Sequence, residues 1–339
     1  MMPSGIRIAI NMRPINRVWG GGNQWALQFL RALRQTGSPV SFSLRASAEV
    51  IVIASCADTT LLRDPNVTKT ITFGVEAIEH YRARHPDVVC LHRVNECDQR
   101  KGTRHIDALL ARANASADYT VFVSEWLRDY HAARWFDTAK PHTVIQNGAD
   151  ERIFSSRGSV DWKPGTPLRL VTHHWSTNWH KGFRVYQELD RLIADGRLPD
   201  TELWVIGRWP AEIRWRSART FRPQQGHRLA PLLRQGHGYV TASQWEPGCM
   251  HIVDGAQCGS PLLYHEDGGG IVEVARAFGV EFRDDLVGAV ELMRQRYREL
   301  RSSVLNAAPS GRMMCQAYLD VIDKAWQAKR GLTLARAVG

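Results

Sequence analysis

Short apolar segments alternate with amphipathic ones along most of the chain, and this alternation limits the possible folds more than any other feature. At the start, the apolar run 6–10 is followed by a loop that ends in Gly20, Gly21 and Gly22 and by a helical pattern over 23–36 that Gly37 stops. Strands that alternate with helices in this way predict parallel, doubly wound α/β sheets.

The same pattern continues to the C-terminus. A further helix is expected after Ser124, whose hydroxyl is placed to cap it. The other predicted strands cover residues 50–54, 88–91, 119–123, 143–145, 168–172, 203–206, 238–242 and 261–264, and the other predicted helices cover 106–117, 183–195, 271–278, 286–300 and 313–329.

With 339 residues, the chain is long enough for two domains that each bury a core. Residues 150–167 are rich in Ser, Gly and Pro and are typical of a linker. We therefore expect an N-terminal Rossmann-like domain over 1–155 and a second over 156–312, facing each other across a cleft. The final helix, 313–339, is expected to pack back toward the first domain.

Composition narrows the location and the partners. The net charge of +10 indicates an anionic partner, and nucleic acid, anionic lipid, a phosphorylated substrate and a merely arginine-rich composition all stay open. No apolar segment is long enough to cross a bilayer, and the N-terminus lacks a secretory pattern, so a cytoplasmic protein is expected, with peripheral contact at the inner face of the membrane as an option. Six scattered cysteines predict reduced thiols rather than disulfides or a metal site.

The segment 245–273, WEPGCMHIVDGAQCGSPLLYHEDGGGIVE, concentrates acids and glycines. If a helix begins near Gly248, its first N–H groups and its dipole favour a diphosphate. Glu246 would then bind neutral sugar hydroxyls, and Asp254, two helical turns further on, would accept hydrogen bonds from the two hydroxyls of a ribose. Alternatively, Glu246 is an ordinary acid at a helix N-terminus, Asp254 is solvated, and the glycines 268–270 form only a turn.

These residues resemble the donor-binding motif of the GT-B glycosyltransferases of family 4 (glycosyl transferases group 1). The family usually has Glu where this chain has Asp254. The matching positions are Ser243, Glu246, Pro247, Gly248, Asp254, Gly259, Pro261, Gly269, Gly270 and Glu273.

The resemblance extends over most of the chain. Gly20 to Gly22 are similar to the family's N-terminal glycine loop, and 123–126, 144–150 and 203–207 are similar to further family elements. Val171 with Lys181 and Gly182 resembles the element that brings a cation to the donor phosphates. The family has an arginine five or six residues before that lysine, where this chain has Trp175 and Ser176. His173, His174, His180 or Arg208 could replace it, and the two adjacent histidines leave a metal site as an alternative.

The resemblance implies a retaining, metal-independent hexosyltransferase of polysaccharide biosynthesis, with an N-terminal acceptor domain and a C-terminal donor domain. It implies no cofactor: the donor is a nucleotide-sugar, UDP-linked by preference and GDP-linked second, and the acceptor is a hydroxyl of a glycan, a lipid-linked or a small molecule. The implied catalytic residues are Glu246, Lys181 and His92. The implied donor-binding residues are Gly21, Gly22, Arg208, Tyr239, Gly248, Cys249, Met250 and Asp254.

Several alternatives stay open. His92 could equally be a core histidine at the end of a strand. The basic residues Arg93, Arg100, Lys101 and Arg104 could meet a phosphorylated acceptor or form a solvated face, and no exposed aromatics accompany them as nucleic-acid binding would require. The run GGGNQW lacks the dinucleotide fingerprint, which disfavours an NAD enzyme. A non-catalytic protein that binds nucleotide-sugars is the main alternative.

Overall fold

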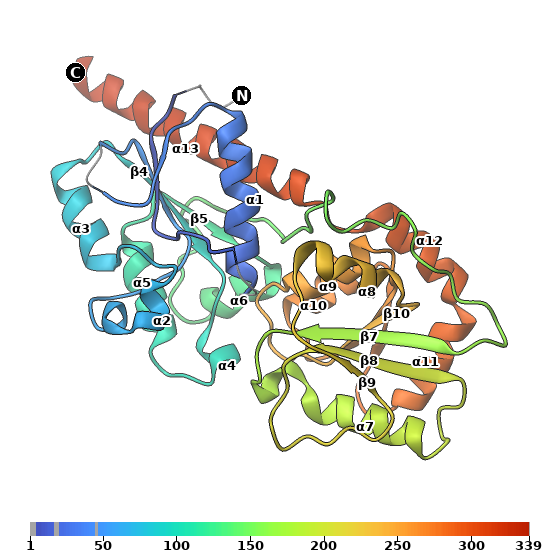
Figure 1. Ribbon diagram of the computed structural model, residues 1–339. Coiled ribbons are helices and arrows are strands. Elements are labelled where there is room, and N and C mark those ends of the chain that lie inside the picture. The colour runs from blue at the N-terminus through green and yellow to red at the C-terminus, as the bar shows by residue number, and fades with distance from the viewer. Residues whose placement is uncertain (1–4, 17–19, 45–46, 339) are drawn as a thin grey trace. The chain divides into compact units, whose positions relative to one another are not determined.

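The computed structural model describes residues 5–16, 20–44 and 47–338 (Figure 1). The chain forms two compact units, Met1–Gln146 with Arg312–Gly339 and Asn147–Gly311. Each unit contains one six-stranded, fully parallel sheet, so the predicted pair of doubly wound α/β domains is confirmed. The cleft between them stays a prediction.

The sheet of the first unit has the strand order β2-β1-β3-β4-β5-β6. Its strands are β1 Ile8–Ile10, β2 Val40–Ser41, β3 Val50–Ile53, β4 Val89–Val94, β5 Tyr119–Phe122 and β6 His142–Val144. Its helices are α1 Gly21–Gln35, α2 Pro65–Thr68, α3 Val75–Arg84, α4 Asp98–Lys101, α5 Ile106–Ala115, α6 Glu125–Ala132 and most of α13 Gly311–Val338, with a 3-10 turn at Leu61–Arg63.

The core of the first unit shows why these segments fold as they do. Alternate residues of β1, β3, β4 and β5 pack with α1 and α13 on one face of the sheet, and the intervening residues of β1, β3 and β4 pack with α3 on the other. Tyr318 of α13 lies 5.2 Å from the ring of Trp25 in α1. The C-terminal helix therefore completes the core of the first unit. The predicted cap is also present, since Ser124 accepts from the N–H of Leu127.

The sheet of the second unit has the order β12-β11-β10-β7-β8-β9. Its strands are β7 Leu168–His174, β8 Thr201–Gly207, β9 Arg219–Phe221, β10 Gly238–Thr241, β11 Leu262–His265 and β12 Gly279–Phe282. Its helices are α7 Phe183–Ala194, α8 Ala230–Arg234, α9 Met250–Gln257, α10 Gly270–Ala275, α11 Leu286–Gln295 and α12 Tyr297–Ala307, with 3-10 turns at Trp179–Lys181 and Gly226–Arg228.

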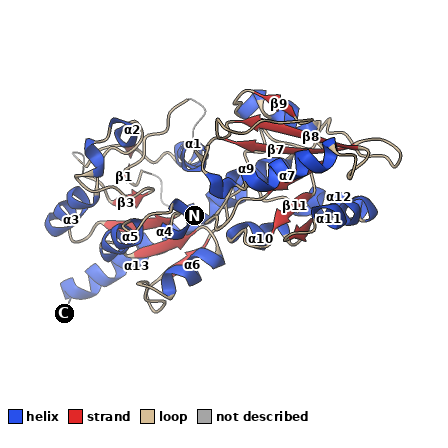
Figure 2. Ribbon diagram, turned by 90° about the horizontal axis from the view of Figure 1, so that it is seen from below, coloured by secondary structure: helices blue, strands red, loops and turns tan. Residues whose placement is uncertain are grey.

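Helices cover both faces of this second sheet (Figure 2). Helices α7 and α11 pack on one face, whereas α8, α9 and α10 pack on the other. Strands β7 and β10 are neighbours, although the chain passes through β8 and β9 between them. In doubly wound sheets the carboxyl ends of two such strands form the usual ligand-binding edge. That edge follows His174 in β7 and Thr241 in β10.

The structure corrects several predictions. Gly21 and Gly22 are not in a loop but are the first residues of α1. Residues 147–155 belong to the second unit, where Phe154 lies in the core, so the boundary precedes the expected one. The single helix expected over 286–300 is two helices, α11 and α12. Among the described residues, no helix is both long and apolar enough to cross a membrane.

Candidate functional site

Lys181 and Glu246 form an ion pair at the carboxyl edge of β7 and β10, with Lys181 Nζ on Glu246 Oε1. Only 14% of the lysine side chain and 9% of the glutamate side chain are exposed. A buried ion pair is retained only where each charge compensates the other, because desolvation of either alone is costly. The structure thus brings together two predicted catalytic residues that are far apart in the sequence.

An unusual backbone places Glu246. Trp245, directly before it, has φ of 53°, a conformation that non-glycine residues rarely adopt. The N–H of Trp245 donates to the carbonyl of Asp267 (2.8 Å), and the carbonyl of Glu246 accepts from Gly270 (2.8 Å). Gly269, with φ of 65°, faces Glu246 so closely that a Cβ would lie 2.9 Å from its carbonyl oxygen. The glycine cluster therefore provides close packing against the Glu246 backbone.

A second glycine fixes Lys181. Gly182 has φ of 85°, and a Cβ there would collide with the backbone of Ala242, the residue after β10. Two hydrogen bonds hold the same loops together: Gln244 N–H donates to the His180 carbonyl (2.9 Å), and the Ser243 hydroxyl donates to the Lys181 carbonyl (3.4 Å). Close packing and these hydrogen bonds thus fix the Lys181 loop against the Glu246 loop.

Helix α9 follows Glu246 but starts at Met250, with Cys249 as its N-cap, rather than at Gly248. The side chains of Cys249 and Met250 are buried in the core, so their main-chain N–H groups are the parts that could meet an anion. The carbonyl of Gly248 accepts from the side chain of Asn147 (2.9 Å). The helix start predicted near Gly248 therefore lies two residues later, at Met250.

Asp254 is fully buried in α9. The alternative that Asp254 is a solvated residue is therefore wrong. Its Oδ2 lies 3.9 Å from His173 Nε2. The Nδ1 of the same ring lies 3.1 Å from the hydroxyl oxygen of Tyr239, which also accepts the main-chain N–H of His173 at 3.1 Å. Burial and the nearby Lys181 lower the pKa of His173 to about 3, so the ring is neutral at pH 7.

The two adjacent histidines have different partners. His174 Nε2 lies 2.9 Å from the hydroxyls of both Thr172 and Tyr186, and burial holds its pKa well below the usual value. His251, the second residue of α9, places Nε2 3.1 Å from the Thr241 hydroxyl. Among the described residues, no group of three or more His, Cys, Asp or Glu side chains is arranged to hold a metal ion. His173 was predicted only as a possible replacement for the missing arginine, and His251 was not predicted as a site residue.

Arg208 follows β8 directly, and its guanidinium stacks over the ring of Trp175, which follows β7. The distance from Cζ to the ring centroid is 4.2 Å. The main-chain N–H of Arg208 donates to the carbonyl of His174 (3.0 Å). The Arg208 side chain is exposed at the same edge of the sheet that carries Lys181. Trp175, near which the sequence resemblance predicted an arginine, thus supports the guanidinium of Arg208 instead.

In the first unit, His92 is a core residue. It lies inside β4 rather than beyond it, and it is fully buried. Its Nε2 lies 3.2 Å from Cys56 Sγ and its Nδ1 lies 3.1 Å from Asn114 Nδ2. Both ring nitrogens are engaged, so the structure fits the alternative of a core histidine rather than a catalytic one. The six cysteines are all free thiols, five of them buried.

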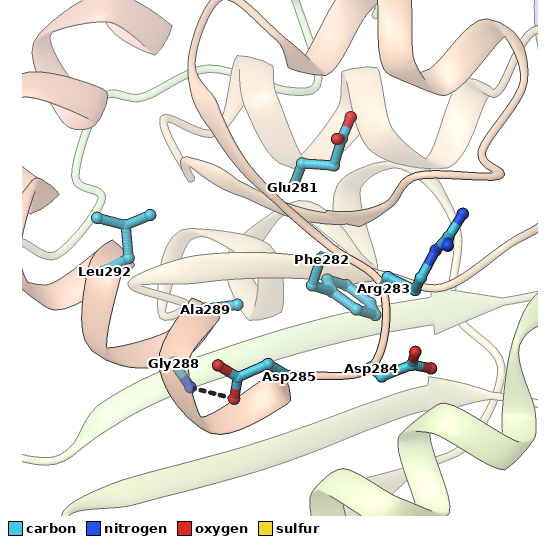
Figure 3. Close-up of a pocket in the computed structure, with 8 residues that line it drawn as sticks. All are labelled: Glu281, Phe282, Arg283, Asp284, Asp285, Gly288, Ala289 and Leu292. Carbon is cyan, nitrogen blue, oxygen red and sulfur yellow. Dashed lines mark hydrogen bonds between the residues drawn. The ribbon is translucent and has the colours of Figure 1, made fainter.

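A hollow lies elsewhere on the second sheet. A depression of about 500 Å³ follows β12 and is lined by Arg283, Asp284, Asp285 and Leu292 with four neighbours (Figure 3). Asp285 is already used as the cap of α11, since its Oδ1 accepts from Gly288 N–H at 2.8 Å. None of the predicted site residues lines this depression.

No protein-family model matches the sequence, and the comparison with curated proteins finds no match. Solved structures do match over nearly the whole chain. HepE from Anabaena, solved with UDP, has a TM-score of 0.65 at 12% identity and covers 94% of this chain and 100% of its own. The chain has the GT-B fold.

Two further structures agree. WaaG, a glycosyltransferase involved in lipopolysaccharide biosynthesis, has a TM-score of 0.62 at 12% identity and covers 94% of this chain and 99% of its own. The sucrose-phosphate synthase from Thermosynechococcus elongatus has a TM-score of 0.57 at 16% identity and covers 98% and 100%. The GT-B fold predicted from the sequence is confirmed.

Proposed function

We propose that this protein is a retaining, metal-independent hexosyltransferase that moves a sugar from a nucleotide-sugar to a hydroxyl acceptor. The observation that carries the proposal is the buried Lys181–Glu246 pair at the carboxyl edge of β7 and β10. A structural role alone would be served as well by two apolar side chains, because a buried ion pair rarely adds net stability. An edge that must meet both phosphate and hydroxyl groups needs both charges.

Each member of the pair has a separate task when the donor binds. The Lys181 ammonium would turn to the diphosphate, where it neutralises the charge that grows as the glycosidic bond breaks. The N–H groups at the start of α9 would add a fixed positive potential at the same oxygens. Glu246, released from Lys181, would accept hydrogen bonds from the donor sugar. No cofactor is needed for these tasks.

Retention requires no nucleophile from the protein in this proposal. The acceptor hydroxyl would attack from the face that the diphosphate leaves, and its proton would pass to a leaving phosphate oxygen. The glycosidic bond to phosphate breaks, the new glycosidic bond forms, and the nucleoside diphosphate departs. Glu246 and Lys181 contribute by orienting the donor and by stabilising charge.

A UDP-linked donor is favoured, with GDP second. HepE, which has the same fold, was solved both with UDP and with UDP-glucose. The acceptor class, whether glycan, lipid-linked or small molecule, would be set by residues of the first unit. The main alternative is a protein that binds nucleotide-sugars without turning them over.

The proposal is tested in two steps. A thermal-shift screen of UDP, GDP and their sugars should show a rise in melting temperature with one nucleoside diphosphate, because a ligand of the folded state must stabilise it. Lys181→Met should abolish that rise, whereas Lys163→Met, at an exposed lysine of the same unit, should not. Product analysis with a labelled sugar and an acceptor library then separates transfer from binding alone. Absence of any nucleotide effect on the wild-type chain would contradict the proposal.

Peripheral membrane contact is a second proposal, and it rests on the segment 208–228, which we call the basic crossover. This segment carries six arginines and one carboxylate, Glu212, in a chain whose total net charge is +10. Asp190 of α7 anchors the crossover by accepting the N–H groups of Arg216, Ser217 and Ala218 at 2.6, 2.9 and 2.7 Å. The backbone at Arg216 is therefore fixed to α7.

Most of this charge is not neutralised locally. Arg216 pairs with Asp195 at 2.8 Å, but Arg214, Arg222 and Arg228 make no ion pair with any described residue. The two tryptophans of the crossover, Trp209 and Trp215, pack edge to face against each other with 5.9 Å between ring centroids and are half-buried, so neither presents an open face to a nucleobase. The crossover thus fits anionic lipid headgroups better than nucleic acid.

Vesicle co-sedimentation tests this second proposal. The wild-type chain should bind vesicles that contain phosphatidylglycerol and not pure phosphatidylcholine. Replacing Arg214, Arg222 and Arg228 with Gln should weaken binding at least tenfold. The same change at the exposed arginines 157, 197 and 276 is the control. Equal loss in both triple variants, or preferential binding of a DNA oligonucleotide, would contradict it.

A further inference from the structure

We propose that His173 makes the direct contact to the ribose hydroxyls of the bound nucleotide, and that Asp254 and Tyr239 position its ring. This inference rests on the proposed function, because it assumes a nucleoside diphosphate at the edge of β7 and β10. It assigns to His173 the contact that the sequence assigned to Asp254.

The first argument is access. The side chain of Asp254 is 1% exposed, whereas that of His173 is 12% exposed. Both belong to the same edge, since His173 is the penultimate residue of β7 and Asp254 lies in α9, which follows β10. A ligand that approaches this edge without unpacking α9 therefore meets the imidazole ring before it meets the carboxylate. An aspartate is also one methylene shorter than a glutamate, which reduces its reach further.

The second argument is the hydrogen-bonding state of the ring. The Tyr239 hydroxyl oxygen accepts the main-chain N–H of His173, so its own proton is free to be donated. Of the two acceptors that His173 offers, Nδ1 at 3.1 Å is nearer than the carbonyl at 3.4 Å. With Nδ1 acting as an acceptor, the proton of the neutral ring must be on Nε2.

The third argument is that the Nε2–H group of His173 has no hydrogen-bond acceptor among the described residues. Nε2 faces Asp254 Oδ2 at 3.9 Å, which is beyond hydrogen-bonding distance, and it makes no hydrogen bond to any described residue. The carboxylate nevertheless favours the Nε2–H form and fixes the plane of the ring, as a carboxylate behind a histidine does in other sites. The ring is thus oriented from both sides and keeps one donor for a ligand.

Neighbouring polar groups are less suited to the contact. Tyr239 is fully buried and its hydroxyl is committed to His173. His251 Nε2 lies 3.1 Å from the Thr241 hydroxyl, and Lys181 is paired with Glu246. A neutral N–H donor next to a carboxylate suits a vicinal diol, whereas a cation suits a phosphate. His173 and Lys181 would therefore recognise different parts of the same nucleotide.

The experiment compares ribose with deoxyribose. Dissociation constants for UDP and 2′-deoxy-UDP, and for GDP and 2′-deoxy-GDP, are measured by titration calorimetry on the full-length chain. The wild type should prefer the ribonucleotide at least tenfold, since a buried donor left unpaired by the deoxy sugar is costly. His173→Phe, which keeps an aromatic ring, should reduce this preference to about onefold through loss of ribonucleotide affinity. His173→Asn, which keeps an N–H donor, should retain part of it.

The control is His227→Phe, at an exposed position of the same unit, which should keep the wild-type preference. A His173→Phe variant that keeps the full preference, while Asp254→Asn loses it, would overturn the inference and return the ribose contact to Asp254. Equal binding of ribo- and deoxynucleotide by the wild type would also overturn it without touching the proposed function. Failure of the wild type to bind any nucleoside diphosphate would overturn both.

Discussion

The two units have the same layers of helix and parallel sheet, but they differ in where they use unusual backbone. In the first unit the described glycines with positive φ, Gly5, Gly37 and Gly102, have open space where a Cβ would be. In the second unit Gly158, Gly165, Gly196 and Gly226 are open in the same way, but Gly182, Gly207, Gly259 and Gly269 combine positive φ with close neighbours. Asp200 and Trp245 add non-glycine residues with φ of 51° and 53°. Of these residues, Gly182, Gly207, Gly269 and Trp245 lie at the carboxyl edge of the second sheet.

Polar groups show the same contrast. In the first unit His92 is enclosed by Cys56 and Asn114. In the second unit Lys181, Glu246 and His173 keep some exposure at the edge of the sheet. Backbone strain and partly exposed charge tend to coincide where a protein must hold a ligand. The comparison therefore supports the proposed donor site in the second unit, and the following changes test it in order of decreasing effect.

The largest effect is expected from an alanine at Gly182. The new Cβ would overlap the backbone of Ala242, and alanine would also have to adopt the left-handed conformation that Gly182 has. The free energy of unfolding should therefore fall by about 3 kcal/mol or more. Gly102→Ala has the same conformational problem with φ of 68° but no neighbour, and should cost about 1 kcal/mol. Urea denaturation measures both. Equal losses of stability in the two variants would mean that the backbone is packed no more tightly around Gly182 than around Gly102.

Replacement of Glu246 by Gln should reduce sugar transfer at least a hundredfold, about 2.7 kcal/mol in transition-state stabilisation, because the charge that orients the donor is lost. Asp118→Asn in the first unit is the matched change, since Asp118 pairs with Arg82 at 2.7 Å and with Lys329 at 3.1 Å. It should lower stability but leave transfer per folded molecule unchanged. Initial rates of transfer from a labelled donor measure both effects. Similar rates for the two variants would contradict the proposed donor site in the second unit.

Acid should destabilise both units through buried histidines. His92 and His173 have pKa values lowered to about 3 by burial, whereas the unfolded chain takes up these protons near pH 6.5. The free energy of unfolding should therefore fall as pH drops from 6.5 toward 3, by about 1.4 kcal/mol per pH unit for each residue. The loss between pH 7 and pH 5 should be roughly 2 kcal/mol smaller in His92→Asn and in His173→Asn. Only the second should alter nucleotide binding.

The smallest effect is expected from the stacked arginines. Trp175→Leu removes the ring under Arg208, and a cation–π contact of this kind contributes about 0.5 to 1 kcal/mol. KM for the donor should rise two- to fivefold with kcat nearly unchanged. Tyr130→Leu removes the ring under Arg134 in the first unit, 3.6 Å away, and should change neither constant. A rise in KM for Tyr130→Leu alone would reverse the assignment of the two units.

Much of the fold could be predicted from the sequence because its strands are apolar and its helices amphipathic. Strand β9 could not, because Arg-Thr-Phe is three residues long and its arginine is exposed. Strand β4 continues beyond the apolar run because His92 and Arg93 find partners in the core that are distant in sequence, with Arg93 over the ring of Trp25 at 4.6 Å. Partners that are distant in sequence leave no pattern in the residues next to His92 and Arg93, so the extra length of β4 could not be predicted.

The site was predictable in part for a similar reason. Glu246, Asp254 and Lys181 stand out because acids, glycines and a lysine–glycine pair recur in a known order. The pairing of Lys181 with Glu246 and the contact of His173 with Tyr239 depend on β7 and β10 becoming neighbours, which no local pattern specifies. Gly21 and Gly22 were misplaced because glycine at a helix start and glycine in a loop look alike in a sequence.

Hydrogen exchange with and without a saturating nucleoside diphosphate tests the central claim most directly, since a bound ligand slows exchange of the amides that it contacts or stabilises. We expect protection to be concentrated in residues 173–182 and 241–254, with little change in 50–58 and 89–96. Protection confined to the first unit, with 173–182 and 241–254 exchanging as fast as in the free protein, would contradict the account.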